Sequence, residues 1–467
     1  MSGRDRSWRF GQYSCRLIEL PKTWLVLLSI QAMHGRFMRH RLILTSGLLL
    51  ILALAASLDA ADRKQPKATD TAKIRKWVEQ LDSDRFAERR KASQLLSQLG
   101  SRSIPFLEPA SHSKSVERSA RAIRILQKLA ESDDESTEDA AVAALQRVII
   151  KAERRVALRA SNALAEQQKF QRQRSIASVR RLGGTVYINS KVQTPSIIVR
   201  IQDSWDGGNR GLRLLKRLGG VTWLSLERSI ISEEGLRYVG ELSQLKKLYL
   251  GQTQLRTGKG LVHLHGLKQL SYLSMRQLPI GNDALKLIGE LKQLDSLGLD
   301  DTKITDSGIK HLAQLKKLSV LWLNRTRITH RGVADLAELP RLRRLYLAGT
   351  RATGPGLATL KNCEYLSYLS LKNVKFAQGD LKFVGQITQL DTLGLDHTNV
   401  SDEQLIHLSG MKKLRVLWLS KTRVSDKGLL HLRALTGLKQ VYLHGAQVTK
   451  DGVAQLRKDL KDCRVHY

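Results

Sequence analysis

Histidines and carboxylates, the side chains that most often carry catalysis or hold metals, occur in this chain without a catalytic spacing. The sequence has no phosphate-binding glycine loop, no GxSxG turn, no HExxH helix and no CxxC pair. Asp300 and Asp301 form a carboxylate pair, but adjacent residues of a strand face opposite ways. His263 and His265 are two apart, an unhelpful spacing for shared ligation on a helix. We therefore expect no enzyme, and neither a metal nor a cofactor.

Aromatic residues, in contrast, recur in a pattern that suits binding. Trp322 and Tyr346 are middle residues of LxL triplets, and Trp418 and Tyr442 repeat them 96 residues further along the chain. The leucines of such a triplet face a core, so alternation along a strand turns the ring to the opposite, open face. Exposed Trp and Tyr are costly in water and are favoured as anchors in interfaces. We predict a binding surface at these four rings.

Charged side chains border the predicted rings. They are Arg325, Arg344 and Lys421, with Asp300 and Asp396 beside the neighbouring glycine-bearing triplets. Aromatic rings next to cations could take an acidic peptide, a glycan or a nucleic acid. The competing interpretation is that the similarity follows from duplication and that the rings only shield a sheet.

The leucines that would position these residues return every 24 residues, with one 25-residue step. Ten coils follow the pattern LxxLxL, a polar turn and a helix-like GLxxLxxL from Val221 onward. No single coil can bury its own leucines, so the coils must stack. Residues 270–365 and 366–461 also align at an offset of 96, which indicates a tandem copy of four coils.

The strings ITDSGIKHL, VSDEQLIHL and VSDKGLLHL make this half of the chain similar to the leucine-rich-repeat superfamily. The type resembles the coils of ribonuclease-inhibitor-like proteins, F-box ubiquitin-ligase receptors and exported bacterial repeat proteins. The resemblance implies an α/β solenoid at residues 221–467, with a parallel sheet on the concave side and helices on the convex side. Residues 183–220 would cap its N-terminal sheet edge, and the final DLKDCRVHY would close the other.

An all-α segment is expected ahead of the repeats. Apolar residues recur at helical spacing between Lys73 and Leu129. The string RRKASQLLSQLGSRSIPFLEPA resembles a HEAT-type repeat, in which a Gly-to-Pro turn joins two helices. We place a HEAT-like unit at residues 62–132. Residues 133–182 are expected to form a solvated acidic linker followed by an Ala-rich helical segment.

The composition favours a folded and strongly basic protein. A chain of 467 residues with 42% hydrophobic content is long enough for two or three domains with a buried core. Its net charge of +35 attracts any anionic surface. Cys15, Cys363 and Cys463 provide no disulfide framework, because the last two are about four coils, or roughly 19 Å, apart.

The beginning of the chain carries an export-like pattern. Residues 42–58 are an apolar run with a basic flank before it and small residues after it, which is the layout of a secretory signal. Read from Met38 the signal is compact, so we expect residues 38–61 to be a signal peptide or a membrane anchor and residues 1–37 an upstream extension. Export would place the protein in the cell envelope or a periplasm-like compartment, secreted or attached to the membrane.

Together these patterns predict a non-catalytic interaction module outside the cytoplasm. Its concave face would bind a protein or an anionic polymer of the cell envelope, and nucleic acid is the least accessible partner for an exported protein. One alternative is an intracellular adaptor similar to the F-box receptors, although no F-box-like motif is found. Another is an enzyme with a site on inserted loops, for which the nearly insertion-free repeats leave little room.

Overall fold

The computed structural model describes residues 68–189 and 196–467 of the chain. The expected upstream extension at 1–37 and the expected signal or anchor at 38–61 lie outside these residues. Within the described ranges, no helix combines the length and the apolarity needed to cross a bilayer. The chain divides into two compact units between Ile125 and Leu126, and each is described by itself.

From residue 68 to the start of the sheet, the regular elements are all helices. They are α3 (Ala68–Gln80), α4 (Phe86–Gln98), η1 (Gly100–Ser103), α5 (Ile104–Ser111), α6 (Val116–Leu129), α7 (Glu135–Lys151) and α8 (Arg154–Arg181). In the first unit Leu81, Leu96 and Leu107 are fully buried. Gly100 takes a left-handed φ of 59° directly after α4, a conformation that glycine adopts without strain. The predicted all-α segment is confirmed, and its likeness to HEAT repeats stays a prediction.

The acidic residues after position 132 begin a helix, where the sequence predicts a solvated linker. Asp134 is the N-cap of α7, and its carboxylate accepts the backbone N–H of Thr137 at 3.0 Å. Acidic side chains near a helix N-terminus are stabilised by its unpaired N–H groups. Glu138 in the same turn is only 7% exposed. Helix capping, which the charge count alone does not show, is the physical reason for this difference.

A sheet of thirteen strands runs through the second unit in chain order. The first two strands pair antiparallel, and every later neighbour pairs parallel. The strands are β1 (Thr185–Asn189), β2 (Ser196–Arg200), β3 (Val221–Ser225), β4 (Lys247–Tyr249), β5 (Tyr272–Ser274), β6 (Ser296–Gly298), β7 (Val320–Trp322), β8 (Arg344–Tyr346), β9 (Tyr368–Ser370), β10 (Thr392–Gly394), β11 (Val416–Trp418), β12 (Gln440–Tyr442) and β13 (Arg464–His466). The predicted stack of coils on one open parallel sheet is confirmed.

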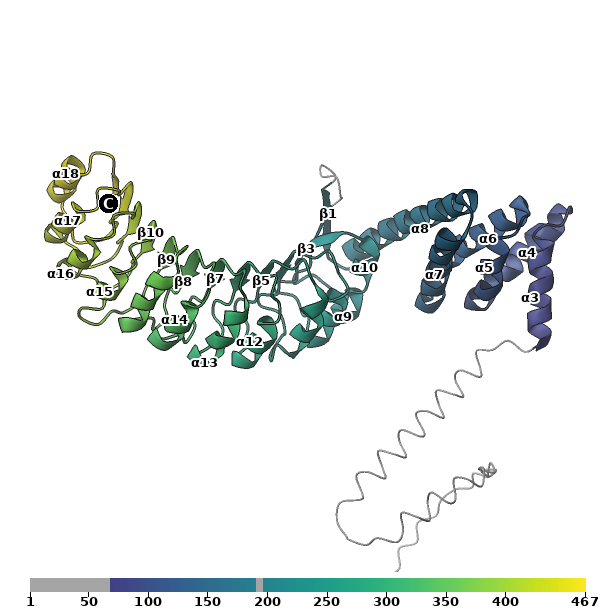
Figure 1. Ribbon diagram of the computed structural model, residues 1–467, viewed down its shortest axis with the longest axis horizontal. Helices are drawn as coiled ribbons and strands as arrows, with labels where there is room; N and C mark the ends of the chain where they lie inside the picture. The colour runs from purple at the N-terminus through teal and green to yellow at the C-terminus, as the bar shows by residue number, and fades with distance from the viewer. Residues whose placement is uncertain (1–67, 190–195) are drawn as a thin grey trace, which may run out of the picture. The chain divides into compact units, whose positions relative to one another are not determined.

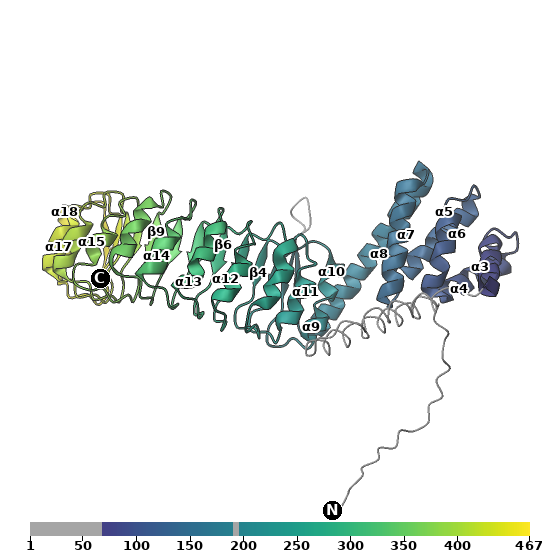
Figure 2. The same cartoon turned by 60° about the horizontal axis from the view of Figure 1, so that its bottom comes forward.

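Short helices follow the strands and lie on the opposite side of the coils (Figure 1), the side that comes forward in Figure 2. They are α9 (Gly208–Gly211), α10 (Leu214–Leu218), η2 (Glu233–Gly235), α11 (Leu236–Val239), η3 (Lys259–Gly266), α12 (Asn282–Ile288), α13 (Asp306–Ile309), η4 (Lys310–Gln314), α14 (His330–Leu336), η5 (Gly354–Asn362), α15 (Leu381–Val384), α16 (Asp402–Leu405), η6 (Ile406–Leu408), α17 (Asp426–Leu432) and α18 (Lys450–Asp459). The strands line the concave side of the repeats and the helices the convex side.

One continuous hydrophobic core fills the space between strands and helices. It extends from Val179 of α8 to Val465 of β13, and the leucines of the LxL triplets are fully buried in it. Cys363 and Cys463 are buried at its edge and form no disulfide. Burial raises the pKa of both thiols to about 11. Both cysteines therefore behave as small hydrophobic residues.

The strands from β3 to β12 each end in the same tight turn, which sets the direction of the side chains along the sheet margin. Arg325 and Lys421 are among eight non-glycine residues that adopt a left-handed φ, between 53° and 61°, at equivalent places. A buried Thr usually follows, and its hydroxyl donates to the carbonyl of a leucine three residues earlier, as Thr326 does to Leu323 at 2.6 Å. This bond stabilises a backbone conformation that side chains with a Cβ otherwise disfavour.

Candidate binding surface

The four aromatic residues predicted from the sequence stand on adjacent strands of the sheet. Trp322 pairs in register with Tyr346, and Trp418 pairs with Tyr442. Their rings are half-buried. The leucines on either side of Trp322 are fully buried on the other face. The rings therefore lie on the concave face, as the alternation of side chains requires.

These rings belong to a longer row, which we name the aromatic ladder. Neighbouring ring centroids in it are 4.5 to 6.1 Å apart, within the range of favourable aromatic pairs. Its members are Trp223, Tyr249, Tyr272, Trp322, Tyr346, Tyr368, Trp418, Tyr442 and His466. The ladder crosses the sheet from β3 to β13.

The sequence prediction found four of these nine rings. Tyr272 and Tyr368 each lie two residues before the middle residue of a triplet, and this spacing places both positions on the same face of a strand. Trp223 occupies the same place in its coil. The signal was therefore present at the position before the first leucine. Tyr249 and His466 were missed because they lie outside the two duplicated middle-residue series.

A glycine lets two rings meet across an intervening strand. Gly298 of β6 lies between β5 and β7, and the rings of Tyr272 and Trp322 approach over it to 6.1 Å with their planes at 61°. The second copy repeats this arrangement over Gly394, with 5.9 Å and 58° between Tyr368 and Trp418. Burial raises the pKa of Tyr272 and of Tyr368 to about 12.

Stacking decides which part of the rings meets the solvent. Trp322 and Tyr346 are 17° from parallel at 5.5 Å, and Trp418 and Tyr442 are 21° from parallel at 5.8 Å. Tyr442 and His466 continue the stack at 7°. In these three stacked contacts each ring faces its neighbour, whereas the other contacts of the ladder are tilted or edge-on. A stacked pair leaves its ring edges, which carry partial positive charge, open to contact.

The predicted cations lie at the margins of the ladder. Arg344 is exposed at the start of β8, in register with Tyr368. Lys421 is exposed in the turn after β11. Arg325 is 61% exposed and forms a two-pronged ion pair with Asp301, at 2.6 and 2.5 Å. Arg344 and Lys421 therefore keep their charge available for a partner, whereas Arg325 shares its charge with a neighbouring coil.

The two predicted carboxylates connect coils. Asp300 accepts the backbone N–H of Asn324 at 2.8 Å, and Asp396 accepts that of Ser420 at 2.9 Å. Burial raises the pKa of Asp300 above its ordinary value, although the bond from Asn324 opposes the shift. Each carboxylate thus has one oxygen engaged in the fold, and both have a structural role in addition to any contact with a partner.

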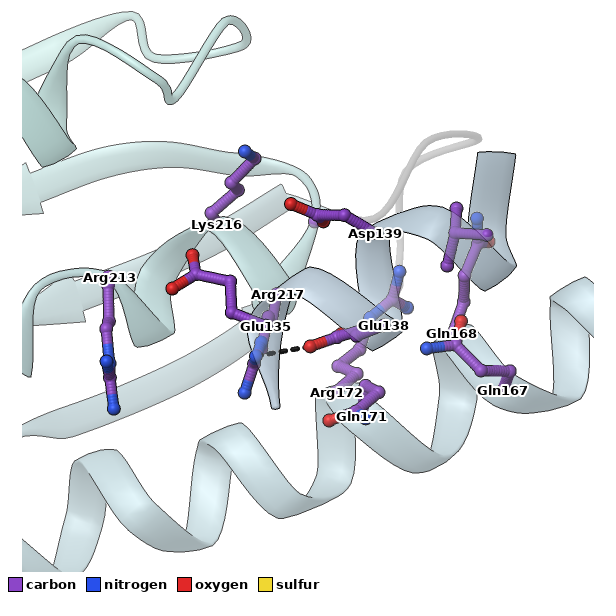
Figure 3. Close-up of a pocket in the computed structure, with 12 residues that line it drawn as sticks. Glu135, Glu138, Asp139, Gln167, Gln168, Gln171, Arg172, Arg213, Lys216 and Arg217 are labelled. Carbon is purple, nitrogen blue, oxygen red and sulfur yellow. Dashed lines mark hydrogen bonds and ion pairs between the residues drawn. The ribbon is translucent and has the colours of Figure 1, made fainter. Parts of the chain in front are cut away.

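A separate hollow of 370 Å³ lies between α7, α8 and α10 (Figure 3). Several of its charged groups are engaged within the protein. Glu138 pairs with Arg217, the Arg172 guanidinium donates to the carbonyl of Leu218 at 2.7 Å, and Lys216 pairs with Glu241 at 2.9 Å. Burial raises the pKa of Glu138, against the opposing effect of Arg217. These bonds attach the helices to the first coil. No cluster of three or more potential metal ligands occurs in the described part of the chain.

The repeats are similar to regions of known proteins. Residues 223–424 match the family model described as a leucine-rich repeat region. Among solved structures, the chain is similar to an internalin from Listeria monocytogenes, with 23% identity, a TM-score of 0.44, and coverage of 54% of this chain and 69% of that one. A leucine-rich-repeat protein of Leptospira interrogans has 18% identity, a TM-score of 0.36 and coverages of 55% and 80%.

A plant peptide hormone receptor, solved in complex with RGF2, is 16% identical with a TM-score of 0.36; 54% of this chain and 44% of the receptor are covered. No match was found among curated proteins. The family model covers the coils from β3 to β11, whose leucines, parallel strands and convex helices are described above. Residues 223–424 of this chain therefore form a leucine-rich-repeat region.

Proposed function

We propose that the chain is a non-catalytic interaction protein that holds a protein partner on the aromatic ladder. Leucine-rich-repeat regions are in general binding modules, and the scaffold is used for many different ligands. The single observation that carries the proposal is the continuous row of half-buried rings on the open face of the sheet. Trp and Tyr in such places supply most of the binding energy in protein interfaces.

The orientation of the rings favours a protein over a glycan or a nucleic acid. Sugars and bases bind aromatic side chains by lying on a ring face. In the ladder, Trp322 and Trp418 have a face stacked on Tyr346 and Tyr442, respectively. The exposed ring edges suit carbonyl oxygens and acidic side chains, which peptides offer in abundance. An anionic polymer of the cell envelope is the other occupant that the test below distinguishes.

Site-specific photo-crosslinking tests where the partner binds. A photoreactive residue replaces Val320 or Val416, which are half-buried beside the Trp on β7 and β11. The matched controls carry it at Lys310 or Lys427, which are exposed on the convex helices. We expect a crosslinked protein adduct from the two concave positions only. Adducts from the convex positions alone, or an adduct that glycosidases remove and proteases leave intact, would overturn the proposal.

A pair of substitutions tests the rings themselves. Trp322→Ala with Trp418→Ala is expected to weaken partner binding by at least about tenfold, because buried Trp anchors are worth about 2 kcal/mol or more. The matched control is Ile406→Ala with Leu430→Ala, which removes two apolar side chains that are 51% exposed on the convex face. Circular dichroism verifies that both variants stay folded. A folded double Trp variant with unchanged affinity would refute the role of the ladder.

We further propose that the protein acts outside the cytoplasm. The support is the apolar run at residues 42–58 with its basic flank, a sequence pattern that lies outside the described residues. N-terminal sequencing of the mature protein and cell fractionation test this proposal. We expect a mature chain that begins near residue 61 or an envelope-bound chain that retains the run. Recovery of the uncleaved chain in the soluble cytosol would contradict export.

A further inference from the structure

The rim of the sheet at which the strands begin carries two basic hollows, which we name the first and second rim hollows. Lys317, Arg341 and Arg343 surround Asp295 in the first, which has a volume of 550 Å³. The second has a volume of 440 Å³. Its charged residues are Asp391, Lys412, Lys413, Arg415 and Lys439. With one carboxylate in each, the net charge is +2 in the first hollow and +3 in the second.

The two hollows are equivalent positions of the tandem copies. Asp295 corresponds to Asp391, Lys317 to Lys413 and Arg343 to Lys439, each pair being 96 residues apart. Backbone hydrogen bonds hold successive coils in the same register at both places. In the second hollow, for example, Lys439 N donates to the carbonyl of Arg415 at 2.8 Å. The duplication has therefore reproduced a cationic site as well as the aromatic ladder.

The carboxylate in each hollow does not neutralise the cations around it. Asp295 accepts the hydroxyls of Ser296 and Ser319, at 2.8 and 2.7 Å. Asp391 accepts the hydroxyl of Thr392 at 2.9 Å and reaches Arg415 only at 3.6 Å. An exposed ion pair of that length contributes little. Both hollows thus retain an excess of exposed positive charge.

The remaining contacts of the cations lie at the exposed surface. Lys317 donates to the amide oxygen of Gln293 at 2.5 Å. Lys439 pairs at 3.1 Å with Asp462, whose side chain is 81% exposed. The Arg343 guanidinium lies over one face of the Tyr365 ring, 5.8 Å from its centroid. The first hollow therefore presents three cations with a single aromatic ring beside them. Its chemistry is that of a site for carboxylates.

The separation of the hollows gives the spacing of the ligand. Neighbouring strands of a sheet are about 4.8 Å apart, so four coils separate the hollows by roughly 19 Å. An extended peptide advances about 3.3 Å per residue and covers that distance in about six residues. We infer that the two rim hollows bind two acidic clusters of one extended peptide, about six residues apart. The inference rests on the proposed function and specifies the partner as a protein with an acidic, regularly spaced segment.

Two synthetic peptides of identical composition test the spacing on the full chain. One carries two Glu-Glu pairs six residues apart in a Gly-Ser background, and the other carries the four Glu together. Binding is measured by isothermal titration calorimetry at low and physiological salt. We expect the spaced peptide to bind at least about tenfold more tightly, because its second pair binds at a high effective concentration. Equal affinities would overturn the two-site inference.

Charge removal tests each hollow separately. Lys317→Gln with Arg343→Gln and Lys413→Gln with Lys439→Gln are each expected to reduce the spaced peptide to the affinity of the compact one. The matched control is Lys303→Gln with Arg327→Gln, two exposed cations just past the strand ends, on the opposite rim. This control removes the same charge and should change the affinity less than about twofold. An equal effect in all three variants would mean diffuse attraction by net charge, and would overturn the inference.

Two further outcomes separate this inference from its alternatives. A polyuronate that competes at both hollows with higher affinity than the spaced peptide would overturn the assignment to a peptide. The variant Trp322→Ala with Trp418→Ala is expected to bind the spaced peptide normally, because that peptide carries no group for the ladder. One combination of results would refute the role of the rim hollows and leave the aromatic ladder supported. In that case the Trp variant no longer binds the natural partner, while both hollow variants bind the spaced peptide as the wild type does.

Discussion

Ser425 of one coil donates its backbone N–H and its hydroxyl to the carboxylate of Asp402 in the preceding coil, at 2.7 and 2.6 Å. Thr449 donates to Asp426 in the same way, at 2.9 and 2.6 Å. The acidic residue of the repeated Val-Ser-Asp pattern, Asp402 in one coil and Asp426 in the next, thus connects successive coils. Its carboxylate is saturated by the fold and has no need of a catalytic explanation.

Removing this tie should destabilise the stack. Asp402→Ala leaves the N–H and hydroxyl of Ser425 without their acceptor, and the expected loss in the free energy of unfolding is about 1–3 kcal/mol. Urea unfolding followed by circular dichroism measures the loss. Asp203→Ala, at an exposed position with no such bond, is the control. The explanation is wrong if both variants unfold at the same urea concentration.

The glycine of the same pattern should be intolerant of a side chain. A Cβ on Gly428 would lie 2.3 Å from Asp402 Oδ1, whereas a Cβ on Gly410 would have nothing within 4 Å. Gly428→Ala is expected to cost about 1–3 kcal/mol through overpacking, and Gly410→Ala to be neutral or slightly stabilising. Thermal unfolding compares the two. Adding Asp402→Ala to Gly428→Ala should cost less than the sum of the single effects, because the clash is removed with the carboxylate.

Acid should weaken the contact between the first and second coils through Glu233. Burial raises the pKa of Glu233, but backbone N–H groups of Thr257, Gly258 and Gly260, at 2.7 to 2.9 Å, outweigh burial and lower that pKa below its ordinary 4.5. Because the pKa is lowered in the folded state, the ionised group stabilises the fold at any pH above its ordinary pKa. This stabilisation is lost as the pH falls through the folded-state pKa.

The stability difference between the wild type and Glu233→Gln should therefore be largest at neutral pH and should shrink once the pH falls below 4.5. Urea titrations at several pH values give this difference. Glu234→Gln, an exposed neighbour, is the matched control and should show no such trend. A difference that is constant from neutral to acid pH would contradict the role of Glu233.

Alkali should act on the ladder through Tyr272 and Tyr368. Their pKa values are raised from 10.0 to about 12 by burial. The folded state keeps the phenol protons that the unfolded state releases near 10.0, so the stability from these groups is present below that pH and is lost as the pH rises toward 12. Tyrosinate absorbance should show a late phase that Tyr272→Phe with Tyr368→Phe removes. The same phase in urea-unfolded wild type would disprove its origin in burial.

Strict periodicity made much of the fold predictable. Leucines such as Leu321 and Leu345 return in one register, and alternation around them places Trp322 and Tyr346 on the open face without further information. The contact of Tyr272 with Trp322 was not predictable in this way, because it depends on two positions of the triplet and on the missing side chain of Gly298. A contact between two strands that are separated by a third leaves no pattern in the sequence of a single coil.

The roles of polar residues were harder to predict from the sequence, for the same reason. Asp300 and Asp396 were predicted to contact a ligand, yet each accepts a backbone N–H from the next coil. The sequence does not tell which backbone groups the neighbouring strand leaves unpaired. The acidic run at the start of α7 was misinterpreted, because the composition of the segment is the same whether Asp134 caps a helix or faces water. The first rim hollow combines residues from four coils and the second from three, and periodicity alone does not single out such combinations.

An aromatic contact closes the second copy at each of its two ends. Tyr346 meets Tyr368 at 4.7 Å where the copies join, and Tyr442 meets His466 at 4.5 Å where the second copy ends. In-frame recombination between the copies can therefore add or delete four coils at a time, and an aromatic ring is present on the neighbouring strand at each new junction. Gain or loss of coils in groups of four would let the number of coils change with the length of the bound partner.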